Sequence, residues 1–145
     1  MINPKLLKDF ELIFENGTNN VLLPYQKGNT IRIGDYAVIF AKVQNTFKIQ
    51  NVIEHKIVAE TFSKTSAIAL AVVLANNKGK ETQIIELDKA IQKHCMDSLF
   101  YRNTIKVSKD DIRRTSACIR LDIAQTKTRD YKSQVERILY MSLAK

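Results

Sequence analysis

The residue types best suited to chemistry in this chain of 145 residues are its two histidines and two cysteines. His94 and Cys95 are neighbours in a segment of helical periodicity, and a thiol beside an imidazole suggests a thiolate nucleophile. However, adjacent residues on a helix point about 100° apart, so the imidazole cannot take the thiol proton directly. We therefore expect Cys95 to be a core thiol that His94 flanks.

The other residues that could carry chemistry also lack a complete arrangement. His94 and Asp97 could share a helical face, but two ligands do not make a metal site. The turn Lys78-Gly79-Lys80 combines glycine with lysine. A phosphate-binding loop also requires a preceding strand and a Ser or Thr directly after the lysine, and this turn has neither. The pair Asp110-Asp111 fits a helix start better than acid–base catalysis. We therefore predict no metal, no cofactor and no enzymatic activity.

The two cysteines allow a geometric prediction. If the helices that carry them turn back on one another near residues 105–109, Cys95 lies opposite Cys118. A disulfide would require their Cβ atoms to approach within about 4.5 Å. Two small buried thiols in a reducing compartment are the simpler interpretation.

The net charge of the chain indicates which kinds of partner it could bind. The chain has 23 Lys and Arg against 15 Asp and Glu, which gives a net charge of +8 and favours contact with polyanions. Acidic residues are interleaved with the basic ones in both halves, which favours an ordinary solvated surface over a dedicated basic arm. Nucleic acid is the alternative partner. The basic residues that would contact it are Lys64, Lys78, Lys80, Arg113, Arg114, Arg120 and Arg129.

The elements that position these residues follow from the hydrophobic period. Apolar residues three and four apart predict a short helix at 4–14, and a period of two over 21–62 predicts three or four antiparallel strands. Ser63 is a plausible N-cap for a helix whose residues 67–75 are all small or aliphatic, so that this helix must be buried. The pattern leaves open which face of the sheet is buried. The polar links expected to form hairpin turns are Gln44-Asn45 and Glu54-His55-Lys56.

Residues 81–145 contain no proline or glycine and predict two long helices with a turn within 103–109. The second helix carries a heptad seam, spaced alternately by four and three residues. A helix with a seam of this length is too long for a compact core of this size. We therefore expect the two long helices to form an arm that packs on the domain near its base and on another subunit near its tip. The seam consists of Ala117, Leu121, Ala124, Thr128, Tyr131, Val135, Ile138 and Ser142.

The order of helix, strands and helix in residues 1–80 resembles that of double-stranded-RNA-binding domains. Their second helix opens with Ser followed by lysines that grip phosphates. Ser63 and Lys64 match this pattern, but Thr65 and Ile68 replace the further lysines. The resemblance thus implies nucleic-acid binding only as the alternative function.

A broader resemblance covers most of the chain from Ile31 onward. Several short segments are similar to small basic proteins of marine bacteriophages, of the kind that infect cyanobacteria. This resemblance implies a viral origin and carries over no catalytic or ligand residues. The segments are Ile33-Gly34-Asp35-Tyr36-Ala37-Val38, residues 58–71, Glu86-Leu87-Asp88, Lys93-His94 and Leu99-Phe100-Tyr101.

The sequence therefore predicts an α+β fold: a small antiparallel sheet of three to four strands packed with two helices, then a long antiparallel helical hairpin. Residues 1–80 would form the small α+β domain and residues 81–145 the hairpin. We expect a non-enzymatic phage structural or assembly protein, located in the virion or the host cytoplasm, that binds other protein subunits and no membrane. The residues expected at the protein interface are Leu121, Ala124, Tyr131, Val135 and Ile138.

Overall fold

The computed structural model describes residues 25–27 and 30–143, with side chains described from residue 30 onward. It has an α+β fold with an antiparallel sheet and long final helices, as predicted. The helix predicted at 4–14 lies outside the described residues. The elements are β1 (Tyr25–Lys27), β2 (Thr30–Ile33), β3 (Tyr36–Ala41), β4 (Thr46–Asn51), β5 (Lys56–Thr61), α2 (Lys64–Ala75), α3 (Glu81–Val107) and α4 (Asp111–Leu143).

The sheet is a simple antiparallel meander in the order β1-β2-β3-β4-β5. Strands β2 to β5 match the predicted sheet, and the three-residue β1 adds a short fifth strand at the edge. Asn45 and His55 have left-handed φ angles of 56° and 54°, which produce the two turns where the polar links predicted them. Val38 pairs with both Ile31 and Ile49 across the sheet, and all three are buried. This row decides which face of the sheet meets the core.

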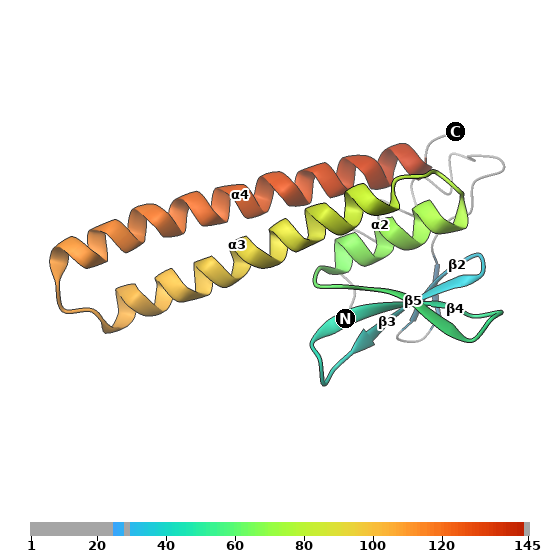
Figure 1. Ribbon diagram of the computed structural model, residues 1–145, viewed down its shortest axis with the longest axis horizontal. Helices are drawn as coiled ribbons and strands as arrows, with labels where there is room; N and C mark the ends of the chain where they lie inside the picture. The colour runs from blue at the N-terminus through green and yellow to red at the C-terminus, as the bar shows by residue number, and fades with distance from the viewer. Residues whose placement is uncertain (1–24, 28–29, 144–145) are drawn as a thin grey trace.

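Helix α2 lies between the sheet and the two long helices (Figure 1). Its N-cap is Ser63, whose Oγ accepts a hydrogen bond from the backbone N–H of Ser66 at 3.4 Å. Residues 66–73 are all buried, which confirms the prediction that a helix without a polar face is covered on every side.

A buried carboxylate ties α3 to the start of α2. Asp88 is 6% exposed, and its two oxygens accept hydrogen bonds from the backbone N–H groups of Phe62 at 2.8 Å and Ser63 at 3.0 Å. These amides lie just before the first turn of α2, where the helix dipole favours negative charge. The contact spans 25 residues of sequence and fixes the rotation of α3 over the sheet.

One hydrophobic core joins the two segments 1–80 and 81–145. It contains Ile33 of the sheet, Leu70 of α2, Ile91 of α3 and Leu139 of α4, none of which is more than 1% exposed. The base of the long helices therefore shares the core of the small domain. Beyond that base, α3 and α4 extend side by side away from the sheet (Figure 1).

The turn between α3 and α4 is shorter than predicted. Residues 103–107 continue α3, and only residues 108–110 separate it from α4. Neither glycine nor proline interrupts this stretch, so α3 ends only at Ser108, whose backbone is extended. Asp110 then accepts a hydrogen bond from the N–H of Ile112 at 2.9 Å, as expected of a helix start.

No helix within residues 25–27 and 30–143 combines the length and apolar character needed to cross a membrane.

The role of Asp88 can be tested by Asp88→Asn. Asparagine keeps one acceptor oxygen but turns an NH2 group toward the second backbone N–H, so the free energy of unfolding should fall by about 1–3 kcal/mol. Urea denaturation measures this change. The control Asp122→Asn alters an exposed carboxylate of α4 and should change it by less than about 0.5 kcal/mol. Equal effects of the two substitutions would contradict the structural role of Asp88.

Candidate functional site

His94 and Cys95 do not form a thiol–imidazole pair. The His94 ring stacks on Tyr131 of α4, with ring centroids 5.6 Å apart and planes inclined by 10°, and its Nδ1 lies 3.9 Å from a carboxylate oxygen of Asp97. Cys95 faces a different groove between α3 and α4, which it lines with Gln125 and Thr128. The geometry therefore packs the imidazole against α4 and gives it no contact with the thiol.

Within residues 25–27 and 30–143, no three His, Cys, Asp or Glu side chains gather closely enough to hold a metal ion.

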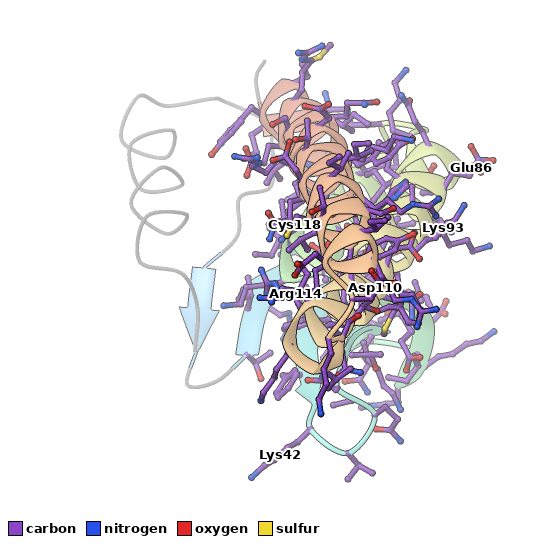
Figure 2. The ribbon with its side chains drawn as sticks, turned by 90° about the vertical axis from the view of Figure 1, so that its left-hand side faces the viewer. Lys42, Glu86, Lys93, Asp110, Arg114 and Cys118 are labelled. Atoms are coloured by element: carbon purple, nitrogen blue, oxygen red, sulfur yellow. The ribbon has the colours of Figure 1, made fainter. Side chains whose placement is uncertain are left out.

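The prediction that Cys95 faces Cys118 is wrong. Both thiols are free; Cys95 is half-buried near Thr128, and Cys118 is exposed on α4. The cause is the late end of α3 at Val107, because a later turn moves the partner of every α3 residue further along α4. Figure 2 shows Cys118 and Arg114 on one side of α4, well away from the side occupied by Lys93 of α3.

The heptad seam of α4 lies inside the chain. Ala124, Val135 and Ile138 are buried, and Leu121 and Tyr131 are half-buried, because α3 and α2 pack against this face of α4. The structure thus corrects the expectation that Ala124, Val135 and Ile138 meet another subunit, whereas for Leu121 and Tyr131 it stays a prediction. A partner could reach the buried ones only by separating α4 from its own chain.

Exposed apolar side chains, which the sequence did not reveal, lie on the outward faces of the distal half of the two long helices. Seven large side chains there are between 49% and 82% exposed. They lie away from the α3–α4 contact. The seven residues, which we call the distal apolar surface, are Met96, Leu99, Phe100, Val107, Ile112, Ile119 and Ile123.

The spacing of these residues is the sequence feature that could have predicted this surface. Met96, Phe100 and Val107 are separated by four and seven residues, so they share one face of α3, opposite the buried Ile84 and Ile91. Polar residues stand between the members of this second stripe and mask its period in the sequence.

A groove of about 480 Å³ lies beside the distal apolar surface. Phe100 and Tyr101 line it from α3, with their rings in edge-to-face contact at 5.4 Å. Ile112, Arg113 and Arg120 line it from α4. The groove therefore combines apolar walls with two of the arginines singled out from the sequence.

The remaining basic candidates are divided among separate places. Lys78 and Lys80 meet Arg137 of α4 in a groove near the base of the long helices, whereas Arg129 lines the groove that contains Cys95. Lys64 is the first residue of α2, where burial lowers the pKa of its ammonium group. The structure thus brings some of these cations together but not all of them.

The exposure of the two cysteines predicts their reactivity. Cys118 should react with an aromatic disulfide reagent at least tenfold faster than the half-buried Cys95, because reaction requires access to the thiolate. Absorbance of the released thiol, compared between Cys95→Ser and Cys118→Ser, measures the two rates. Formation of a Cys95–Cys118 disulfide in the folded monomer on mild oxidation would contradict the register described above.

Comparison with known proteins identifies no family. No protein-family model, no curated protein and no solved structure matches this chain. Its function must therefore be inferred from its own residues and their geometry.

Proposed function

We propose that this chain is a non-enzymatic structural or assembly protein of a bacteriophage, and that it binds other protein subunits. In this proposal the small α+β part is the anchor, and α3 and α4 act as a projecting helical hairpin whose distal half makes the contact. The sequence resemblance to small phage proteins supports the viral origin, and the exposed side chains support the mode of action.

The observation that carries the proposal is the distal apolar surface. Exposed apolar side chains are normal singly, but seven of them on the outward faces of two paired helices are typical of an interaction surface. Ile112, Ile119 and Phe100 are 82%, 59% and 66% exposed, so little of each side chain is covered by its own chain. Contact between this apolar area and water is unfavourable, so its burial by a partner would stabilise the complex.

A second copy of the chain is the occupant we favour. A two-fold interface uses the same patch on both subunits, so the outward apolar face of a helix can be buried by the same face of a second copy. Two copies that meet in this way pack one long helix against its counterpart and remove its apolar stripe from water. The spacing of Met96, Phe100 and Val107 suits the packing of one helix on another.

Substitution at this surface tests the proposal. The double variant Ile119→Gln and Ile123→Gln should weaken self-association at least tenfold, since burial of each isoleucine stabilises the contact by roughly 1.5–3 kcal/mol. Sedimentation velocity over a concentration series measures the association constant.

The matched control is Val43→Gln with Ile53→Gln. These two residues are 94% and 66% exposed in the turns of the sheet, so the change in hydrophobicity is similar but lies far from the distal surface. The control should associate like the unmodified chain. A chain that stays monomeric up to about 100 μM and is also missing from purified phage particles by mass spectrometry would contradict the proposed function.

Salt gives an independent test of the same contact. Because each chain carries +8, two copies repel one another at low ionic strength, and salt screens this repulsion while leaving the apolar contact intact. Self-association measured by sedimentation should therefore strengthen between about 50 mM and 500 mM salt. If it weakens over this interval, attraction between opposite charges holds the copies together, and the apolar surface is not the contact.

A further inference from the structure

The basic groove near the base of the long helices is lined by hydrogen-bond donors. It has a volume of about 310 Å³, and Lys78, Lys80 and Gln83 face Gln134 and Arg137 across it. The other lining residues are Ile138, Met141 and Ser142, so the described lining contains three cations and no carboxylate. Such a lining suits an anion, because every charged group that reaches the groove is positive.

The backbone between α2 and α3 holds the two lysines in place. Asn77 and Gly79 adopt left-handed φ angles of 53° and 71°, which turn the chain sharply after α2. The N–H of Lys78 donates to the carbonyl of Val73 at 3.0 Å, which closes the last turn of α2. As a result, Lys78 and Lys80 are presented to α4 by a defined turn.

A row of three cations and one glutamine on α4 leads into this groove. Arg113, Arg120, Lys127 and Gln134 follow one another at intervals of seven residues, and all four are exposed. Seven residues make almost two helical turns, so successive members lie about 10.5 Å apart on one side of the helix, with a drift of about 20° per step. Gln134 lines the groove itself, so the row continues into the groove.

These cations are not neutralised by neighbouring acids. In the part of the chain that the structure describes, Lys48 forms an ion pair with Glu60, and no ion pair involves the row or the groove. Asp130 lies near the row on α4, Asp110 lines a groove with Arg113 and Arg120, and Glu81 follows Lys80. Six cations against these three acids leave the surface positive. The six, which we call the basic track, are Lys78, Lys80, Arg113, Arg120, Lys127 and Arg137.

We propose that the basic track binds the phosphate backbone of a nucleic acid, in addition to the protein contact proposed at the distal apolar surface, which it borders in the groove that Arg113 shares with Phe100. The row from Arg113 to Gln134 spans about 31 Å, far more than a small phosphate ester requires. Cations placed along a straight helix at regular intervals match a duplex, which is nearly straight over this length. The track contacts phosphates, so binding should be independent of base sequence.

Fluorescence anisotropy with a labelled DNA duplex of about 20 base pairs, and with one of its strands alone, tests this proposal. The full chain should bind the duplex more tightly than the strand, and its affinity should fall steeply between about 50 mM and 200 mM salt. The triple variant Lys78→Gln, Lys80→Gln and Arg137→Gln should lose at least tenfold in affinity at the lower salt. Its slope of log K against log salt should be less steep by about three, one for each lost phosphate contact.

The control removes the same charge elsewhere. Lys42→Gln, Lys93→Gln and Arg114→Gln alter exposed residues that lie at three separate places around the molecule in Figure 2. This control should retain affinity to within about threefold, and thermal unfolding should show both triple variants folded.

Several results would overturn the assignment. Equal losses of affinity in the two triple variants would show that binding depends only on net charge. An absence of binding at the lower salt would contradict the proposed site. Tighter binding of the single strand than of the duplex would contradict the proposal that the straight row of cations on α4 contacts a duplex. If poly-glutamate competes as well as unlabelled duplex of equal charge, the track is a site for acidic protein instead.

Discussion

The structure depends on the burial of α2, because this helix has no polar face and must be covered on every side. The sheet covers one side, and the bases of α3 and α4 cover the rest. Asp88 fixes this arrangement by satisfying the two backbone N–H groups that lead into α2. An apolar helix in the middle of the fold thus requires the start of α3 and the end of α4 to lie together against α2, on the side away from the sheet.

The lengths of the helices then decide what remains exposed. Helix α2 has 12 residues and is about 18 Å long, whereas α3 and α4 have 27 and 33 residues and reach about 40 and 50 Å. Beyond the core, the two long helices have only each other to pack against. Each buries one stripe in that contact, so Phe100 on α3 and Ile119 on α4 face outward. The distal apolar surface is therefore a consequence of the difference in length.

The two proposed surfaces respond to salt in opposite directions. An apolar contact between copies that each carry +8 is opposed by repulsion, and salt relieves it. Phosphate contacts made by Lys78, Lys80 and Arg137 release counterions, and salt weakens them. A helical arm that joins protein subunits while its base and one side of α4 hold nucleic acid would suit a particle in which protein layers meet a packaged polyanion.

The sequence by itself determined the local elements of the described chain. The period of two predicted strands β2 to β5, the polar links predicted the turns at Asn45 and His55, and the apolar run of α2 predicted its burial, because each signal depends on residues close in sequence. Only the tertiary structure decided the register of α3 on α4, which placed Cys95 near Thr128. It also decided that the heptad seam is buried within the chain, and that Lys78 and Lys80 meet Arg137. The physical reason is that helical periodicity shows which residues share a face, whereas the element that covers this face depends on where the chain turns back and on which core holds it.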